Sequence, residues 1–185
     1  MIILCGKTSS GKDTIQNELL KRGMRSVVSY TTRPPRDGEI DGVTYHFISK
    51  EEFLKKIEDG FFAETTSYVV ANGDTWYYGS AIEDLTSDKV TIMNPYGVKE
   101  LKKHKELNPI VFYIIADEET IWNRLRQRGD NSEQARCRLN ADAEDFKDIN
   151  KYIDFAIRND GAVEPNVLAD IILGLYRRWC SELVQ

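Results

Sequence analysis

The chain opens with Met1-Ile2-Ile3-Leu4-Cys5, and Gly6-Lys7-Thr8-Ser9-Ser10-Gly11-Lys12-Asp13-Thr14 follows at once. An apolar run of this kind is typical of a strand that is buried on both faces of a parallel sheet. The stretch after it matches the phosphate-binding pattern G-x-x-x-x-G-K-[ST] except at its last position, where Asp13 stands. In such a loop, backbone N–H groups converge on phosphate oxygens at the positive end of a helix. We therefore predict a phosphate site here, with Lys12 neutralising the transferred phosphoryl group.

The last position of the pattern usually carries a hydroxyl that helps to hold magnesium, so Asp13 has two interpretations. It can be an acid that stabilises the first turn of the helix, while magnesium is held through water. It can instead approach the metal directly or through one water, because a carboxylate is a hard oxygen ligand. We favour the first interpretation and keep Asp13 as the candidate metal ligand. Thr14 still offers a hydroxyl one residue later.

Strand-like and helix-like segments alternate along most of the chain. Apolar runs predict buried strands, and apolar residues at three- and four-residue spacing predict helices between them. This order favours an α/β doubly wound sheet of five parallel strands, whose ligands bind beyond the carboxyl ends of the strands. The predicted strands are residues 1–5, 26–30, 90–93, 110–116 and 155–157, and the predicted helices are residues 14–21, 98–105, 118–128 and 163–183.

Two segments interrupt this alternation. Residues 31–82 hold short polar and aromatic strand patterns, and Asn72-Gly73 between two of them is a hairpin signal. This insert is predicted to form a small antiparallel subdomain. The segment from Arg124 to about Arg138 is rich in arginine, and Asp130 and Glu133 stand in capping-box positions that would start a new helix.

Composition limits the classes of protein. A chain of 185 residues with 41% hydrophobic content is long enough for one compact domain. The net charge of -5 offers no basic footprint, which argues against nucleic acid as a partner. The sequence shows no leader and no apolar span, so we expect a cytoplasmic protein without membrane contact. Its three cysteines lack metal-ligand spacing and are interpreted as buried or partly buried thiols.

The most specific motif is Ser29-Tyr30-Thr31-Thr32-Arg33-Pro34-Pro35-Arg36-Asp37-Gly38-Glu39, with Asp41-Gly42-Val43-Thr44-Tyr45-His46-Phe47 after it. Two arginines on either side of a diproline cannot share a helix, because proline bars it. They stand on a stiff loop instead. Guanidinium groups fixed in this way suit bidentate recognition of a phosphate, and Tyr45 adds a hydroxyl donor.

Together with the opening loop, Tyr77-Tyr78-Gly79-Ser80, Arg124-Leu125-Arg126-Gln127-Arg128-Gly129 and Arg138-Leu139, this motif resembles the guanylate kinase family from Met1 to about Asp160. The resemblance implies a nucleoside monophosphate kinase that phosphorylates GMP or dGMP with ATP and Mg²⁺. It also implies one domain of residues 1–185, with a core of residues 1–30 and 83–185, a part that binds the monophosphate (31–82), and a lid at about residues 125–145.

The resemblance further implies roles for individual residues. A carboxylate at Glu64 would accept hydrogen bonds from two adjacent N–H donors of guanine, and it would penalise AMP, which has no such pair. The lid arginines would close on the charged phosphates of the transition state, although a solvated helix face is an alternative for any one of them. The implied catalytic residues are Lys12, Arg33, Arg124, Arg128 and Arg138. The implied ATP-binding residues are Gly6, Lys7, Thr8, Ser9, Ser10, Gly11, Lys12, Asp13, Thr14 and Asn159, and the implied GMP-binding residues are Ser29, Arg33, Arg36, Glu39, Tyr45, Glu64, Tyr78, Ser80 and Asn94.

The chain departs from the family pattern at the end of the third predicted parallel strand. The family places aspartates there, whereas this chain has Ile92 and Asn94. Asn94 can bond a base or Lys12 but carries no charge to order magnesium. One hypothesis is that Asp13 partly replaces the missing acid. These changes also leave two alternatives: a kinase for another nucleoside monophosphate, and an inactive binding module, against which Lys12 and the lid arginines argue.

Overall fold

The computed structural model describes residues 1–70 and 73–182. Its centre is a five-stranded sheet in the order β2-β7-β1-β8-β9, in which every pair is parallel. The predicted α/β fold class is therefore confirmed. Because β1 is the middle strand, the loop that follows it emerges at the centre of the sheet. The strands are β1 (Ile2–Cys5), β2 (Arg25–Ser26), β7 (Lys89–Ile92), β8 (Ile110–Ile115) and β9 (Phe155–Arg158).

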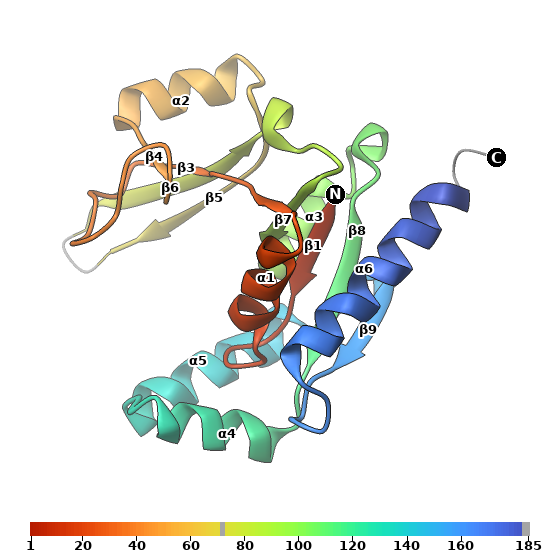
Figure 1. Ribbon diagram of the computed structural model, residues 1–185. Coiled ribbons are helices and arrows are strands. Elements are labelled where there is room, and N and C mark those ends of the chain that lie inside the picture. The colour runs from red at the N-terminus through yellow and green to blue at the C-terminus, as the bar shows by residue number, and fades with distance from the viewer. Residues whose placement is uncertain (71–72, 183–185) are drawn as a thin grey trace.

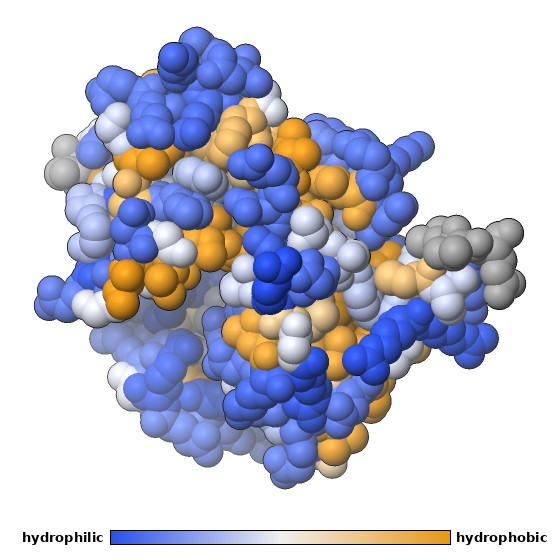
Figure 2. All heavy atoms as spheres, turned by 45° about the horizontal axis from the view of Figure 1, so that its top comes forward, coloured by the Kyte–Doolittle hydropathy of each residue, from blue (hydrophilic) through white to orange (hydrophobic). Residues whose placement is uncertain are grey.

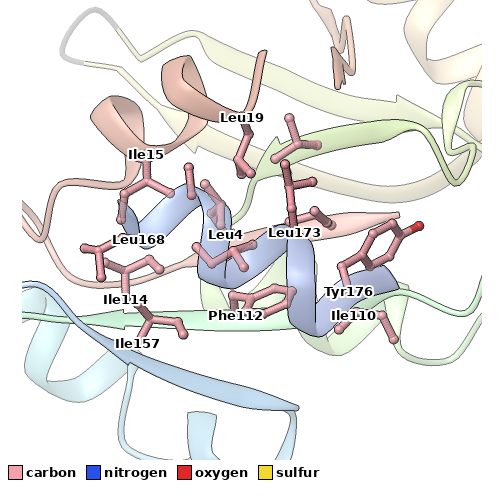
Figure 3. Packing of buried hydrophobic residues seen from close by; sticks show 14 residues of the cluster. Leu4, Ile15, Leu19, Ile110, Phe112, Ile114, Ile157, Leu168, Leu173 and Tyr176 are labelled. Carbon is pink, nitrogen blue, oxygen red and sulfur yellow. The ribbon is translucent and has the colours of Figure 1, made fainter. Parts of the chain in front are cut away.

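Helices cover both faces of this sheet (Figure 1). On one face lie α1 (Lys12–Lys21) and α6 (Pro165–Glu182), and on the other lies α3 (Pro95–Leu101). Strand β1 is buried on both sides, because Ile2 and Leu4 belong to the cluster under α1 and α6, whereas Ile3 belongs to the opposite one. Figure 3 shows the first cluster, with Leu4, Ile15 and Leu168 among its members. Each fully buried aliphatic side chain of this kind contributes about 1.5–3 kcal/mol.

The insert forms a second sheet to one side of the core (Figure 1), in the order β4-β3-β6-β5. Strands β3 and β4 are parallel and the other pairs antiparallel, so the sheet is mixed. Its helix α2 was not predicted, although Ser49 caps it by accepting a hydrogen bond from the backbone N–H of Glu52. That pair is a capping-box signal. The elements of the insert are β3 (Tyr30–Thr31), β4 (His46–Phe47), α2 (Lys50–Glu58), β5 (Phe62–Val69) and β6 (Thr75–Ala81).

Two helices, α4 (Glu118–Gln127) and α5 (Ser132–Asp145), form an α4–α5 hairpin at the edge of the core (Figure 1). The predicted capping box of α5 is wrong. The cap is Asn131, whose side chain accepts hydrogen bonds from the backbone N–H groups of Glu133 and Gln134. Asp130 instead pairs with two arginines. Short 3₁₀ turns complete the described chain at Ile82–Asp84, Lys105–Leu107 and Ile149–Lys151.

Other boundaries differ from the predictions. The strand predicted at residues 26–30 is divided, because the chain leaves the parallel sheet after Ser26 and enters the second sheet at Tyr30. The helix predicted at residues 98–105 begins three residues earlier and ends at Leu101. Cys137 is exposed rather than buried. The predicted turn residue Asn72 and the predicted helix end at Leu183 lie outside the described residues.

No helix within residues 1–70 and 73–182 is long and apolar enough to cross a membrane.

Candidate active site

The loop of residues 6–11 lies beyond the carboxyl end of β1, and its glycines cannot be replaced without strain. A Cβ atom at Gly6 would lie 2.5 Å from the backbone oxygen of Ile114. Gly11 has a φ of +93°, and a Cβ atom there would lie 2.3 Å from Nδ2 of Asn159. The loop therefore passes against its neighbours with backbone alone, as loops that bring backbone N–H groups close to a phosphate do.

Polar groups of this loop lack the partners that burial demands. The hydroxyl oxygens of Ser9 and Ser10 are buried and have no hydrogen-bond partner in the described part of the chain. Such orphaned groups indicate a ligand or water that completes the site. The Nζ atom of Lys12 donates to the backbone oxygen of Lys7 at 2.9 Å. Burial lowers the pKa of Lys12, and the nearby carboxylate of Asp13 opposes this shift.

Arg124 and Asn159 hold the outer side of the loop. Nη1 of Arg124 donates to the backbone oxygens of Ser9 and Ser10 at 3.2 Å each, and Nη2 donates to the backbone oxygen of Asn159 at 2.8 Å. Nδ2 of the buried Asn159 donates to the backbone oxygen of Ser10 at 2.8 Å. A pocket of about 500 Å³ opens beside them. Its lining is Ser9, Gly11, Asp13, Thr14, Arg124, Gln127, Arg128, Asn159 and Pro165.

The other two predicted lid arginines, Arg128 and Arg138, are held by a carboxylate of the hairpin itself. Arg128 and Arg138 both pair with the carboxylate of Asp130, at 2.5 Å and 3.1 Å. The hydrogen bond from Arg128, together with the charges of both arginines, holds the pKa of Asp130 below its ordinary value. Both arginine side chains are about half exposed. The carboxylate of Asp130 therefore occupies the two arginines that were predicted to close on phosphates.

A second cationic cluster lies in the insert. The guanidinium group of Arg33 is 4% exposed and binds both carboxylate oxygens of Glu39, at 2.9 Å and 2.7 Å. Glu39 also accepts a hydrogen bond from the backbone N–H of Arg36 at 2.7 Å. These bonds, above all that from Arg33, hold the pKa of Glu39 below its ordinary value. Glu39 thus ties the two ends of the diproline loop together.

Aromatic rings surround this ion pair. The guanidinium carbon of Arg33 lies 5.6 Å from the centre of the Tyr45 ring, and the Tyr45 and Tyr78 rings meet edge to face at 6.1 Å. The side chain of Arg36 is exposed. The structure therefore brings Arg33, Glu39, Tyr45 and Tyr78 together and leaves the side chain of Arg36 at the surface.

Glu64 lies in the same insert, in a position that a β-bulge creates. The pairing of β5 with β6 shifts between Phe62 and Glu64, which places Glu64 opposite Ser80. Bulges of this kind re-aim side chains. The hydroxyl of Ser80 donates to Oε1 of Glu64 at 2.7 Å, and the hydroxyl of Ser29 lies 3.2 Å from that of Ser80. Burial raises the pKa of Glu64.

One pocket of about 280 Å³ joins these groups. Figure 2 shows a recess between the insert, at the upper left, and the part of the molecule below it. The strand-end residues Ile92 and Asn94 line the pocket as well. The pocket lining is Ser29, Tyr45, Glu64, Thr66, Tyr68, Tyr78, Gly79, Ser80, Thr91, Ile92, Met93, Asn94 and Gly97.

Asn94 has taken a structural role at the edge of this pocket. Its Oδ1 atom caps α3 by accepting the backbone N–H of Gly97 at 2.8 Å, and its Nδ2 atom donates to the hydroxyl of Tyr68 at 3.2 Å. Within the described residues, the side chain of Asn94 thus bonds Gly97 and Tyr68 and not Lys12. Sequence reasoning missed Tyr68, because its place in a long hairpin gives no local sign of the contact with Asn94.

Asp142 of α5 is the other residue that sequence reasoning missed. Its Oδ2 atom accepts a hydrogen bond from the backbone N–H of Thr8, at 2.6 Å. The two residues are separated by 134 positions, and no motif connects them. One acid of the hairpin therefore touches the phosphate loop directly.

A loop with orphaned buried hydroxyls lies in the centre of a doubly wound sheet, and a separate pocket is lined by a carboxylate and by a tyrosine that packs on a buried arginine. Together these features define a nucleoside monophosphate kinase. A family model described as guanylate kinase matches residues 1–167. The chain belongs to the guanylate kinase family.

Individual relatives agree with this assignment. A guanylate kinase of Symbiobacterium thermophilum is 35% identical over 168 residues, which cover 86% of this chain and 77% of that protein. A guanylate kinase of Clostridioides difficile is 32% identical over 181 residues, or 93% of this chain and 86% of that protein. The crystal structure of guanylate kinase from Anaplasma phagocytophilum has the same fold, with a TM-score of 0.69 at 23% identity; the match covers 96% of this chain and 84% of that one.

Proposed function

We propose that this protein transfers the γ-phosphoryl group of ATP to GMP or dGMP and releases ADP and the diphosphate. The observation that carries the proposal is the pocket that Glu64 and Ser80 line together with Tyr45, whose ring centre lies 5.6 Å from the guanidinium carbon of Arg33. A base and a phosphate of one nucleotide need such a pair of sites. The phosphate loop supplies the separate site that a donor nucleotide needs.

The acceptor's phosphate would bind to Arg33, Arg36, Tyr45 and Tyr78. Arg33 is already held by Glu39, so little conformational entropy is lost when it meets a phosphate. Arg36 adds a second cation, because its side chain is exposed while Glu39 fixes its backbone. Glu39 itself orients the arginines and does not touch the phosphate.

The acceptor's base would be recognised by Glu64, Ser80 and Ser29. An ionised Glu64 can accept from two adjacent N–H donors, and guanine presents such a pair on one edge. The hydroxyl of Ser80 fixes the carboxylate by donating to Oε1. Adenine would offer this half-buried carboxylate no such pair of donors, so the carboxylate would keep only the hydrogen bond from Ser80, and that penalty gives the preference.

The donor's phosphates would bind to the loop of residues 6–14, with Asn159 and Arg124 beside the donor pocket. Lys12 would exchange its bond with the backbone oxygen of Lys7 for phosphate oxygens, and Arg128 and Arg138 would leave Asp130 to meet the same charge. Closure of the insert and the hairpin would exclude water, which favours transfer over hydrolysis.

Magnesium would arrive with ATP. Within the described residues, no three His, Cys, Asp or Glu side chains are placed to hold a metal ion by themselves. This donor set fits Mg²⁺, which keeps several waters and binds through one or two protein oxygens and the substrate's phosphates. The exposed carboxylate of Asp13 and the hydroxyl of Thr14 would hold it. When bound, the ion neutralises negative charge on the phosphates.

The division into parts follows from these roles. We propose one domain of residues 1–185, with a core of residues 1–30 and 83–185, a monophosphate-binding part of residues 31–82 and a lid at about residues 125–145. We further propose a cytoplasmic location and no nucleic acid partner.

The test is ADP release from ATP and Mg²⁺ with GMP, dGMP, AMP, UMP, CMP and dTMP offered in turn. Activity confined to GMP and dGMP is the expected result. Preference for another base would replace the proposed acceptor, and no release with any acceptor, although ATP binds, would make the protein a binding module.

A further inference from the structure

The contact between Asp142 and the phosphate loop occupies a position that a donor phosphate needs. The backbone N–H of Thr8 is one of the loop groups that converge on phosphate oxygens in such sites. Here it donates to a carboxylate oxygen at 2.6 Å. That short distance is typical of a charge-assisted hydrogen bond. A phosphate oxygen and the carboxylate of Asp142 carry like charges and cannot both accept this hydrogen.

The carboxylate of Asp142 does not stabilise α5, the helix that carries it. The last turn of α5 contains Asp142, Glu144 and Asp145 and no basic residue. Negative side chains at the C-terminal end of a helix oppose its dipole. The favourable interactions of Asp142 are instead with the phosphate loop, through the hydrogen bond from Thr8 and the charge of Lys12.

Asp142 lies midway between two other contacts of α5. Four residues later, on the same side of the helix, the ring of Phe146 is buried in the core and stacks on Tyr113 of β8 at 5.7 Å. Four residues earlier, Arg138 lies on the same side but is held by Asp130 at the outer end of the hairpin. Releasing Asp142 would remove the direct link between α5 and the loop, and would leave α5 held by Phe146 and by the packing of Ala135 and Leu139 on α4.

We propose that Asp142 is an internal competitor for the phosphate loop. In the absence of ATP it holds α5 against Thr8, and the donor's phosphates displace it. ATP binding thereby frees α5 from the loop, so that Arg138 can approach the phosphates. The proposal rests on the proposed use of this loop as the ATP site.

The first experiment measures the affinity for a non-hydrolysable ATP analogue with Mg²⁺ and without GMP, by calorimetry. Asp142→Asn keeps the shape of the side chain and removes its charge, and Asp142→Ala removes the acceptor altogether. Both variants are expected to bind the analogue more tightly than the wild type. A latch that is closed about nine-tenths of the time would weaken apparent binding about tenfold, so its loss restores about that factor.

Asp145→Asn is the matched control. It removes the same charge from the same turn of α5, and its exposed side chain makes no bond to the loop. Its affinity for the analogue is expected to equal that of the wild type. Tighter binding by all three variants would show a general charge effect and overturn the latch.

The second experiment measures amide hydrogen exchange of residues 132–141. In the wild type, exchange is expected to rise when the analogue binds. In Asp142→Asn it should be high before the analogue is added. Weaker or unchanged binding in both Asp142 variants, or exchange that does not respond in the wild type, would overturn the proposal and assign Asp142 to support of the loop. A protein that binds ATP and shows the latch but phosphorylates no nucleotide would contradict the proposed function alone.

Discussion

At the scale of single residues, Glu64 is expected to lower stability while it provides base preference. Burial raises its pKa above the ordinary value of 4.5. The contribution of this carboxyl to stability is therefore fully present below its unfolded pKa and is lost as the pH rises through its folded pKa. Glu64→Gln should melt at a higher temperature than the wild type at neutral pH and lose this part of the pH dependence. Thermal unfolding between mildly acidic and neutral pH tests this, with Glu58→Gln on the exposed side of α2 as the control. An unchanged melting temperature and pH slope in Glu64→Gln would contradict it.

Glu39 is expected to act on the acceptor's phosphate through Arg33. Its pKa is lowered by Arg33, so its contribution to stability is present above its unfolded pKa and is lost as the pH falls through its folded pKa. Glu39→Gln should raise KM for GMP about tenfold, the scale expected when a charge-assisted hydrogen bond is lost, and should leave KM for ATP unchanged. Steady-state kinetics with each substrate varied distinguish the two. Asp37→Asn, on the same exposed loop, is the control. Equal changes in both KM values would show general damage to the protein.

The charge at position 13 is expected to support magnesium use. Burial lowers the pKa of Lys12 and the carboxylate of Asp13 opposes that shift, whereas Asp130 chiefly raises the pKa of Arg128 and Asp13 adds to that rise, so the field of Asp13 reaches both cations. Asp13→Ala should raise the magnesium concentration for half-maximal rate. Asn94→Asp, which can keep the cap of α3, should restore part of it if Asp13 replaces the missing strand-end acid. A double variant no better than Asp13→Ala would remove that hypothesis.

At the scale of elements, the neighbours Asn131 and Asp130 have different roles at the start of α5: Asn131 caps the helix, and Asp130 pairs with two arginines. Asn131→Ala should cost about 1 kcal/mol of unfolding free energy, because Asn131 satisfies two backbone N–H groups. Asn131→Asp, which also caps, should cost much less. Asp130→Ala should spare the cap and release Arg128 and Arg138. Chemical denaturation measures all three variants. A larger loss for Asp130→Ala than for Asn131→Ala would restore the capping box that the sequence suggested.

Elements were predictable where the local pattern and the tertiary environment agree. Strand β1 is apolar at every position and is buried on both faces. Residues 26–30 could not be assigned correctly, because the change from one sheet to another depends on partners far along the chain. Helix α2 had a usable signal at Ser49 and Glu52 that was outweighed by the aromatic strand patterns around it.

At the scale of the whole molecule, the sequence predicted the identity of the site residues better than it predicted their contacts. The motif of residues 29–47 predicted Arg33, Glu39 and Tyr45, which the structure brings together. The contact of Asp142 with Thr8 joins distant segments and leaves no local pattern. The bonds of Arg124 to the loop's backbone oxygens depend likewise on the packing of α4 against the core.

We expect the insert to select guanine through Glu64. The most direct measurement is the ratio of kcat/KM for GMP to kcat/KM for AMP, in the wild type and in Glu64→Gln. We expect a large ratio in the wild type and a fall of about tenfold or more in the variant, because the paired acceptor for the two guanine donors is lost. A wild-type ratio near one, or the same ratio in both proteins, would contradict the claim.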